Sequence, residues 1–441
     1  MSAPDAPSRS RIAAASFVGT AIEFYDFYIY GTAAALVFGP LFFPSFSAAA
    51  GRLAALATFA VGFVARPVGA VLFGHFGDRM GRKRMLITSL LVMGLSTVAV
   101  GCVPSFASIG VAAPVLLAVL RFAQGIGLGG EWGGAVLLAT EYAPPGKRGL
   151  YSAFPQLGPA IGFALGNLLY LVLGASMTAG SFAAWGWRIP FWASAVLLVV
   201  GFYIRVRIAE TPVFRAASAA GQTSRVPFWE LLRRQPGVLG LATCAFILAF
   251  TMFYTITTFC LAYGTATLHI GKTTMLLEAI VAALVMGAAT LWFAMLSDRV
   301  GRRRLCLAAA VVSGLWAFPL FWLLQTRQPV LVGIGMVVGL VCFALLYGPM
   351  GAYFPELFRV RYRYSGASFA YSAAGIVGGG ISPLVATSVL ARTHSTAGVS
   401  WYLIGVAVLC LVCLLCLGDT RAADFTDGLA PEVSREARRE S

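Results

Sequence analysis

The sequence predicts an all-α membrane protein with twelve transmembrane helices in two pseudo-symmetric six-helix bundles. Hydrophobic residues make up 59% and charged residues 11% of its 441 residues, whereas soluble domains are about half apolar and a quarter charged. The apolar residues fall into twelve long runs, and one short basic motif occurs twice at half-chain spacing. These three observations predict the fold class.

Each apolar run is about as long as a helix must be to cross the roughly 30 Å hydrocarbon core of a bilayer. The expected spans are residues 12–38, 53–73, 85–102, 114–139, 150–173, 189–206, 237–262, 275–296, 305–325, 330–352, 364–390 and 399–418. The first run is too long for the apolar part of a signal peptide, so we expect it to stay in the mature protein.

The order of the spans divides the chain into two bundles with polar segments around them. The expected parts are a cytoplasmic N-terminal tail at 1–11, a first bundle at 12–206, a cytoplasmic linker at 207–236, a second bundle at 237–418 and a cytoplasmic tail at 419–441. The linker is basic and contains several prolines, and residues 226–234 within it favour a short amphipathic helix on the membrane surface.

Lysine and arginine gather on one side of the predicted membrane. Of the 32 basic residues, 25 fall in segments assigned to the cytoplasm, five fall outside, and two, Arg66 and Arg121, lie within spans. Positive residues stay on the cytoplasmic side, so both termini are expected in the cytoplasm, at a bacterial-type inner membrane. The net charge of +15 then sets topology, and no nucleic-acid partner is expected.

A short basic turn is repeated in the two halves. Residues 78–84 and 298–304 share the pattern Asp-Arg-x-Gly followed by three basic residues, 220 positions apart. Glu141 and Glu356 are each followed by an arginine seven residues later, at an offset of 215. Two independent correspondences at similar offsets indicate a duplicated six-helix unit.

Five ionisable side chains lie well inside the predicted spans, namely Glu23, Asp26, Arg66, Arg121 and Glu131. A charge at this depth is unfavourable unless it faces a cavity or a partner, so each residue is a candidate functional group. The structural alternative is an arginine–carboxylate pair that only holds two helices together.

The spacing of Glu23, Asp26 and Tyr30 places them on one helical face, which we expect to look inward. Two carboxylates this close do not both ionise readily, so one is expected to bind and release a proton. Arg121 is the expected counter-charge. The sequence therefore predicts a proton-coupling site made of Glu23, Asp26 and Arg121.

The expected substrate site combines arginine forks, which suit carboxylates, with amide and aromatic side chains. Its predicted members are Tyr30, Arg66, Arg121, Gln124, Gln156, Asn167, Tyr254 and Tyr371. For the tyrosines the alternative is core packing, and for the amides it is hydrogen bonding between helices.

The sequence argues against an integral-membrane enzyme. His75, His269 and His394 lie at separate helix ends, and the eight cysteines lie in or at the ends of apolar runs. No metal-ligand or nucleophile–base spacing is visible. We therefore expect no metal and no cofactor other than a coupling proton.

Several motifs resemble those of one transporter family. The turn at 74–84 resembles the signature loop of the major facilitator superfamily, and residues 121–125 resemble its fourth-helix motif. The segments that resemble its metabolite:proton symporter branch are residues 23–26, 62–69, 130–134 and 154–158. That branch includes carriers for shikimate, α-ketoglutarate, citrate and proline/betaine. The resemblance covers about residues 12 to 417.

The resemblance implies a gate on the cytoplasmic side and a proton-coupling role for Arg121. Asp78 would cap the eleventh helix near Ser365, one of Arg79, Arg82 and Arg84 would meet Glu141, and Asp298 would face the fifth helix near Gly149. The implied gating residues are Gly74, Asp78, Arg79, Gly81, Arg82, Arg84, Glu141, Asp298, Arg299 and Gly301. Such contacts hold the inside shut and break on inward opening.

Together these features predict proton-coupled uptake of a small organic acid by alternating access, by a monomer in the lipid bilayer. Two alternatives keep the fold. One is uptake of a zwitterionic osmolyte such as betaine or proline, against which the last residues show no coiled-coil heptads. The other is export of drugs or metabolites, for which the segments at 23–26 and 130–134 would be unusual.

Overall fold

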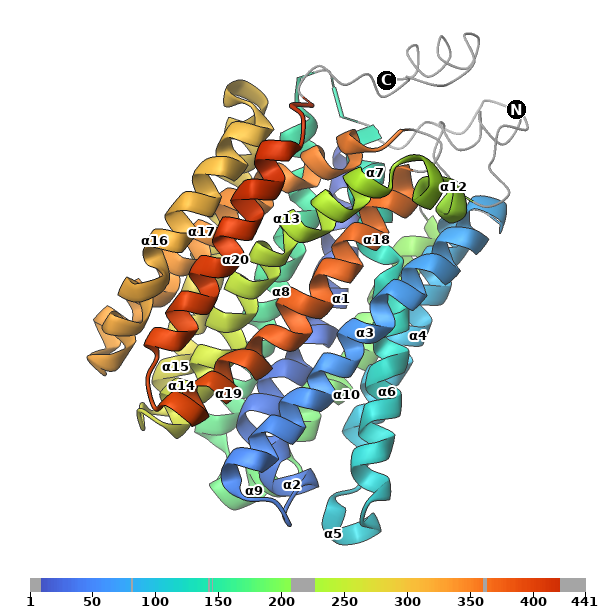
Figure 1. Ribbon diagram of the computed structural model, residues 1–441. Helices are drawn as coiled ribbons and strands as arrows, with labels where there is room; N and C mark the ends of the chain where they lie inside the picture. The colour runs from blue at the N-terminus through green and yellow to red at the C-terminus, as the bar shows by residue number, and fades with distance from the viewer. Residues whose placement is uncertain are drawn as a thin grey trace, which may run out of the picture.

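The chain forms a bundle of long helices joined by short turns (Figure 1). The computed structural model describes residues 9–80, 82–141, 143–144, 146–207, 227–359 and 363–420, and these ranges contain no strand. Helices are the expected solution, because a helix satisfies its own backbone hydrogen bonds in a medium that offers none.

The first half contains six membrane-crossing stretches and several short helices. Its elements are α1 (Arg9–Ala33), η1 (Ala34–Phe38), α2 (Gly39–Phe42), α3 (Ala48–Met80), α4 (Arg82–Cys102), α5 (Phe106–Ile109), α6 (Ala112–Gly129), α7 (Glu131–Glu141), α8 (Arg148–Ser176), α9 (Ala179–Ala184), η2 (Gly186–Arg188) and α10 (Ile189–Arg207).

The second half repeats this arrangement after residue 226. Its elements are α12 (Pro227–Arg234), α13 (Pro236–Tyr254), η3 (Thr255–Phe259), α14 (Cys260–Ala266), α15 (Lys272–Val300), α16 (Arg302–Gln325), α17 (Pro329–Leu357), α18 (Arg363–Gly375), η5 (Ile376–Ile381), α19 (Ser382–Thr393) and α20 (Ala397–Cys416).

The prediction of twelve spans is confirmed. Eleven helical stretches of the described residues are long and apolar enough to cross a membrane, and α1 with η1 and α2 supplies the first span. From residue 19 to residue 33, every residue of α1 is buried by other helices. Because it does not face lipid, it can carry Glu23, Asp26 and several hydroxyl groups in place of an apolar surface.

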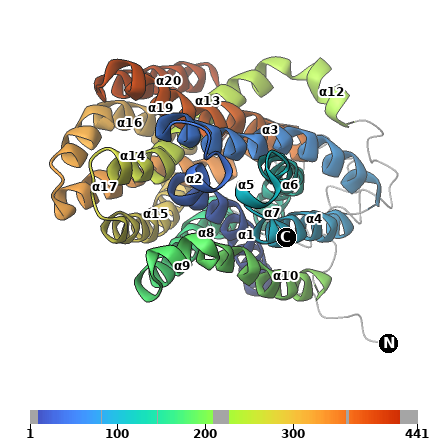
Figure 2. The same ribbon diagram turned by 90° about the horizontal axis from the view of Figure 1, so that it is seen from below.

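The two halves have equivalent packing, as the repeat predicts. In the first half α1 packs on α8, α3 on α6, α4 on α10 and α1 on α10. In the second half the corresponding pairs are α13 with α18, α15 with α17, α16 with α20 and α13 with α20. The halves meet where α3 packs on α18 and α8 on α15. Figure 2 shows them side by side from below.

Within the part of the chain that the structure describes, four of the spans are interrupted. The first, seventh and eleventh contain the π-helical turns η1, η3 and η5, and the fourth breaks at Gly130 between α6 and α7. Such turns weaken the regular backbone hydrogen bonding and are frequent at functional sites. The glycine-rich sequence of η5 makes such an irregular turn easier to form.

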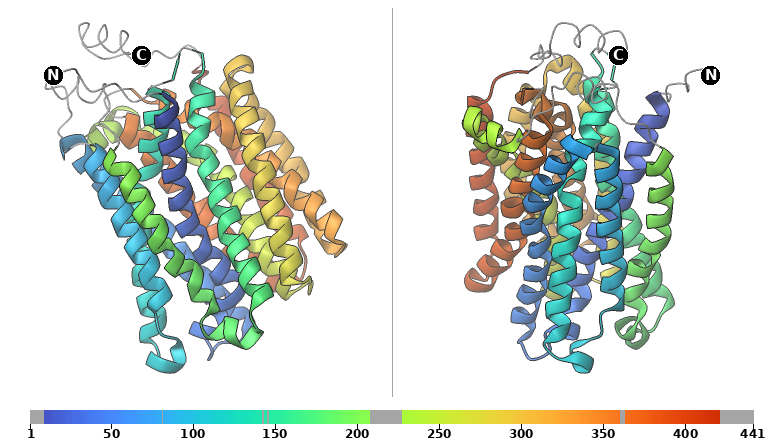
Figure 3. Two further views of the ribbon diagram at one scale, coloured as in Figure 1. Left: turned by 180° about the vertical axis from the view of Figure 1, so that it is seen from behind. Right: turned by 90° about the vertical axis from the view of Figure 1, so that its right-hand side faces the viewer.

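The two ends of the bundle differ. At one end, called here the α12 face, lie α12, the start of α8 and the end of α15, whereas α5 and α9 lie at the opposite end (Figures 1 and 3). The expected amphipathic helix is present as α12: Leu231 is buried, Phe228 packs on Phe369, and Trp229 is exposed. The linker residues 208–226 lie outside the described residues.

Glycines allow α3 and α6 to pack backbone against backbone. A Cβ atom on Gly125 would overlap the carbonyl oxygen of Gly62, and one on Gly129 would overlap the carbonyl oxygen of Arg66. This close approach fixes Arg66 on α3 and Arg121 on α6 in neighbouring positions.

We expect Gly125→Ala to lower the free energy of unfolding by about 1–3 kcal/mol, because the added methyl group forces the two backbones apart. Gly174→Ala is the matched control, since a Cβ at Gly174 in α8 meets no atom within 4 Å. Thermal unfolding of the detergent-solubilised protein measures both variants. Equal melting temperatures for the two would contradict the packing argument.

Candidate functional site

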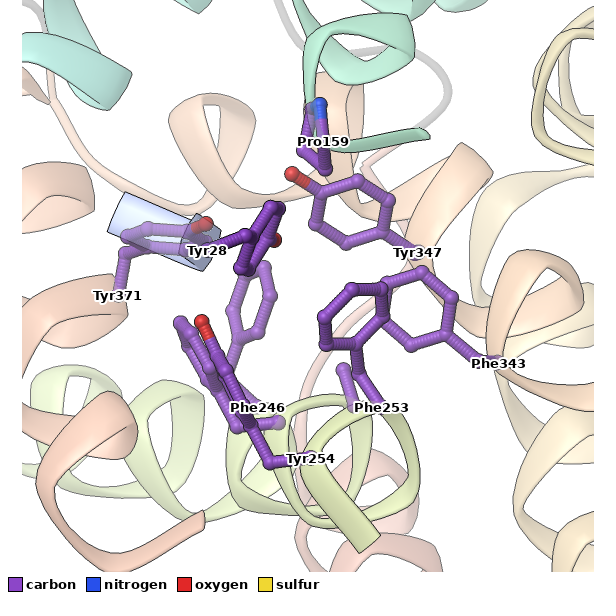
Figure 4. Close-up of a pocket in the computed structure, with 10 residues that line it drawn as sticks. Tyr28, Pro159, Phe246, Phe253, Tyr254, Phe343, Tyr347 and Tyr371 are labelled. Carbon is purple, nitrogen blue, oxygen red and sulfur yellow. The ribbon is translucent and has the colours of Figure 1, made fainter. Parts of the chain in front are cut away.

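A small aromatic cavity lies between the two halves (Figure 4). Its walls are formed by Tyr28 of α1, Pro159 of α8, Phe246, Ala249, Phe250, Phe253 and Tyr254 of α13, Phe343 and Tyr347 of α17, and Tyr371 of α18. The cavity volume is about 10 Å³, which is room for about one water molecule. A metabolite therefore needs the two halves to move apart before it can bind here.

Ring contacts hold the walls of this cavity together across the two halves. Tyr28 lies 5.2 Å from Phe253 between ring centroids, and Trp132 stacks on Tyr371 at 4.0 Å with the planes 2° apart. Trp132 directly follows Glu131 at the start of α7. The break in the fourth span is thus linked to the cavity through Tyr371.

Arg66 lies beside the cavity, behind two of its walls. Its guanidinium carbon is 4.9 Å from the ring centroid of Tyr371 and 5.6 Å from that of Phe250, and the rings of Phe27 and Phe63 lie 5.7 and 5.5 Å away. The side chain is completely buried, and none of its three nitrogens has a hydrogen-bond partner among the described residues. Ring faces alone offset only a small part of the free-energy cost of burying a cation.

Arg121 is buried in a more polar setting. One of its nitrogens donates to Gln124 Oε1 at 2.9 Å and approaches the carbonyl oxygen of Phe27 at 3.5 Å. Its guanidinium carbon lies 3.9 Å from the Phe27 ring centroid and 4.3 Å from that of Tyr30. Its Nε and Nη2 atoms have no partner within the part of the chain that the structure describes. Phe27 therefore separates the two arginines.

The expected inward direction of Glu23 and Asp26 is wrong. Both carboxylates face α10: Ser194 donates to Asp26 Oδ1 at 2.5 Å, and Glu23 pairs with Arg205. Tyr28 is the residue of α1 that lines the cavity, because it lies well over 120° around the helix from both acids. Tyr30 donates to Thr58 at 2.9 Å.

Arg121 is also not the counter-charge of these acids, since no ion pair of Arg121 occurs among the described residues. Arg205 takes this role. It contacts Glu23, lies 2.7 Å from Glu131 Oε1, and donates to the carbonyl oxygen of Leu86. Ser89 donates to the same Glu131 oxygen at 2.7 Å.

Sequence reasoning missed Arg205 because it grouped this residue with the cytoplasmic charges at the end of the sixth span. A signal was available. Glu23, Asp26 and Glu131 are three acids at membrane depth, and at least one cation was needed near them. Arg205 is the basic residue that the predicted span 189–206 contains.

The remaining predicted substrate residues lie in three places. Tyr254 and Tyr371 line the cavity. Gln156 donates to the carbonyl oxygens of Tyr347 at 2.8 Å and Gly348 at 3.1 Å, and so joins α8 to α17 beside the cavity. Gln124 supports Arg121 and donates to Thr97 at 2.6 Å.

Asn167 lies away from the cavity residues. Its Oδ1 accepts from Thr32 at 3.2 Å and its Nδ2 donates to the carbonyl oxygen of Phe163 at 2.8 Å. The first bond joins α8 to α1, and the second lies within α8. The contacts of Asn167 therefore match the structural alternative of hydrogen bonding between helices.

On the α12 face, Asp298 occupies the position that the repeat predicts. Its two carboxylate oxygens accept from the backbone nitrogens of Gly149 at 2.9 Å and Leu150 at 3.1 Å, at the start of α8. A carboxylate at a helix N-terminus satisfies unpaired N–H groups and the positive end of the helix dipole. The contact joins the two halves of the molecule.

The neighbouring residues extend this contact. Arg302 lies 3.2 Å from Asp298 Oδ1 and 3.1 Å from Glu356 Oε2, and Thr420 donates to Glu356 at 2.7 Å. Gly301 has a φ of +107° and forms the turn between α15 and α16. Arg299 and Arg84 are exposed.

The remaining gating residues were predicted in the first half of the chain. Gly81 lies outside the described residues, and the structure does not describe the surroundings of five others. These are Gly74, Asp78, Arg79, Arg82 and Glu141. Their gating roles stay predictions.

No group of three or more histidine, cysteine or acidic residues suited to a metal ion occurs within the described residues. The site therefore consists of an aromatic cavity, two arginines beside it, a buried acid–arginine cluster and an inter-half contact on the α12 face.

Comparison with known proteins gives the same result for sequence and for fold. The profile of the Major Facilitator Superfamily matches residues 16–383. The inner membrane metabolite transport protein YhjE of Escherichia coli K12 is 44% identical over 419 residues, covering 94% of this chain and 95% of that protein. The shikimate transporter of the same organism is 39% identical, covering 94% of this chain and 96% of that protein.

A proline/betaine transporter of Escherichia coli K12 is 31% identical, covering 94% of this chain and 84% of that protein. The solved structure of the proton:xylose symporter XylE bound to 6-bromo-6-deoxy-D-glucose matches with a TM-score of 0.74 at 18% identity, covering 97% of this chain and 98% of that one. The resemblance inferred from the motifs is confirmed. The chain belongs to the Major Facilitator Superfamily and is a secondary transporter of metabolites, not an enzyme.

Proposed function

We propose that this protein imports a small organic acid together with a proton, by alternating access and as a monomer. The observation that supports the substrate class most strongly is Arg66: a completely buried guanidinium with no hydrogen-bond partner among the described residues, beside the cavity walls Phe250 and Tyr371. A carboxylate entering the opened cavity would supply the missing bidentate partner.

The aromatic walls also suit a quaternary ammonium group, so a zwitterion such as betaine is the second candidate. Its cation would meet the cavity rings and its carboxylate would meet the arginines. The charge balance favours a net anion: two arginines lie at or near the cavity, and its lining residues include no acid.

Asp26 is the proposed proton carrier. It is 1% exposed, accepts a hydrogen bond from Ser194, and has no ion pair among the described residues. A buried carboxyl group without a cation is favoured in its neutral, protonated form. Arg121 reaches the backbone of the next residue, Phe27, and its part in proton coupling stays a prediction from the sequence.

The α12 face is the proposed cytoplasmic side, because the basic residues gather there and positive charge stays in the cytoplasm. In this arrangement Asp298 holds the cytoplasmic side closed through Gly149 and Leu150. We assign the same role to Asp78 by the repeat. The linker and both termini would then also be cytoplasmic, at a bacterial-type inner membrane.

The carboxylate assignment is tested by Arg66→Lys and Arg121→Lys, which keep the charge but lose the planar fork. We expect the half-saturation constant for an organic acid to rise about ten- to hundredfold, since a hydrogen bond to a charged group contributes roughly 1.5–3 kcal/mol. Uptake of labelled shikimate and of a panel of organic acids and glycine betaine into cells provides the measurement.

Arg392→Lys is the control, because Arg392 is exposed at the end of α19. If glycine betaine is the best substrate, or if organic-acid uptake ignores both core substitutions, the carboxylate assignment is wrong.

Asp26→Asn should abolish proton-driven accumulation and leave counterflow exchange, because exchange requires substrate binding but no net proton transfer. Proteoliposomes with an imposed pH gradient measure both activities, and Glu230→Gln on α12 is the control variant.

Right-side-out vesicles with an inward proton gradient distinguish import from export. Accumulation by the unmodified protein that ignores a protonophore would exclude proton coupling.

Asp298→Asn should lower turnover about tenfold, which corresponds to a shift of about 1.4 kcal/mol between the open and closed states. The amide loses the charge and one of the two acceptor oxygens at the start of α8. Substrate affinity should change little, since the cavity is untouched. Loss of binding with unchanged turnover per bound molecule would contradict the gating role.

A further inference from the structure

A buried cluster in the first half contains more negative than positive charge. Its members are Glu23 on α1, Glu131 on α7 and Arg205 on α10, with exposed fractions of 2%, 1% and 8%. Arg205 contacts both carboxylates, through different nitrogens. One cation therefore serves two acids, and the fully ionised cluster would carry a net charge of −1 in a buried site.

The hydrogen bonds of the cluster do not compensate the second charge. Glu131 Oε1 accepts from Arg205 and from Ser89, both at 2.7 Å, whereas Glu131 Oε2 is buried with no hydrogen-bond partner among the described residues. An ionised carboxylate with one bare buried oxygen is strongly unfavourable. A protonated carboxyl group removes the excess charge.

We propose that Glu23, Glu131 and Arg205 form a second proton-binding site, separate from Asp26, whose occupancy controls closure of the α12 face. The proposal rests on the proposed proton coupling and adds a site to it. The bound proton is carried by one of the two carboxylates. On release it passes to water, and one carboxylic acid becomes a carboxylate.

The position of the cluster explains where this proton would go. Arg205 lies in the last turn of α10 and donates to Leu86 in the second turn of α4, so the cluster is near the α12 face. Two other titratable groups of the described residues lie close to it: Asp26, three residues after Glu23 on α1, and Tyr364 of α18, which bonds to Gly130 beside Glu131. Opening of this face would bring water to the cluster.

The break in the fourth span connects the cluster to the second half. Tyr364 donates a hydrogen bond to the carbonyl oxygen of Gly130, which directly precedes Glu131. Ser368, one turn further along α18, lies against Gly133. The same short segment thus carries one proton-binding acid and the inter-half contact. With the proton bound, the neutral cluster stays dry and the face closed; without it, the net charge favours hydration and opening.

The labelling rate of Ser368→Cys tests this inference in the full-length chain with its eight native cysteines replaced. Ser368 is 1% exposed in the closed arrangement, so a water-soluble maleimide reacts only after opening. The labelling rate of Ser108→Cys, an exposed position, measured in the same background at the same pH, corrects for the ordinary ionisation of the thiol. We expect the ratio of the two rates to rise with pH, by up to about tenfold per pH unit for the loss of one proton. No substrate is needed. A ratio that does not change with pH overturns the proposal without any further variant.

Glu131→Gln and Glu23→Gln should each remove this pH dependence, since either amide leaves one acid for one arginine. Two tests for the same proton keep the inference testable if one variant fails to fold. Asp26→Asn and the control Glu230→Gln on α12 should keep the dependence. If Asp26→Asn alone removes it, or if both cluster amides keep it, the second site does not exist.

Infrared difference spectra over the same pH range give an independent measurement. Two C=O bands of protonated carboxylic acids are expected, one from Asp26 and one from the cluster. The cluster band should be lost in Glu131→Gln and in Glu23→Gln, and it should persist in Asp26→Asn, which loses only the band of Asp26. If no organic acid is taken up, but labelling and spectra change in Glu131→Gln and Glu23→Gln as expected, the proposed substrate is wrong and the second site stands. If only Asp26→Asn uncouples uptake and the spectra ignore the cluster, only the second site is wrong.

Discussion

The burial of arginine inside a membrane bundle is the constraint on which the rest of this structure depends. A guanidinium cannot lose its charge under ordinary conditions, so the fold must supply anions, acceptors or ring faces. Arg205 receives two carboxylates, Arg121 receives Gln124 and ring faces, and Arg66 receives ring faces alone. This order runs from a satisfied cation to an unsatisfied one, and the least satisfied arginine lies beside the cavity.

Close helix packing makes this arrangement possible. The glycines of α3 and α6 bring two backbones into contact, and this places Arg66 and Arg121 near one ring, that of Phe27. Both guanidinium carbons lie over this ring, at 5.7 and 3.9 Å from its centroid. Like charges repel strongly in a low dielectric. An anion bound near either arginine would therefore also reduce the repulsion that acts on the other arginine.

The sequence predicted the spans, the duplication and the position of Asp298, because length, motif spacing and a helix N-terminus are local properties. It did not predict the direction of Glu23 and Asp26. An amphipathic helix reveals its buried face through periodicity, but α1 is buried on nearly all sides, so its pattern contains no such signal. The partner of Glu23 lies 182 positions later, at Arg205, and only the packing of α1 on α10 brings them together.

The fourth span connects the two functions that the proposed mechanism requires. Arg121 lies before its break at Gly130 and Glu131 directly after it, while Trp132 stacks on the cavity residue Tyr371. A rigid helix would transmit a movement of Arg121 directly to Glu131. A broken one allows α7 to move with α18 of the second half, to which Tyr364 joins it, while α6 stays packed on α3. Substrate binding and proton release can therefore occur on opposite sides of one glycine and still depend on the same closure of the two halves.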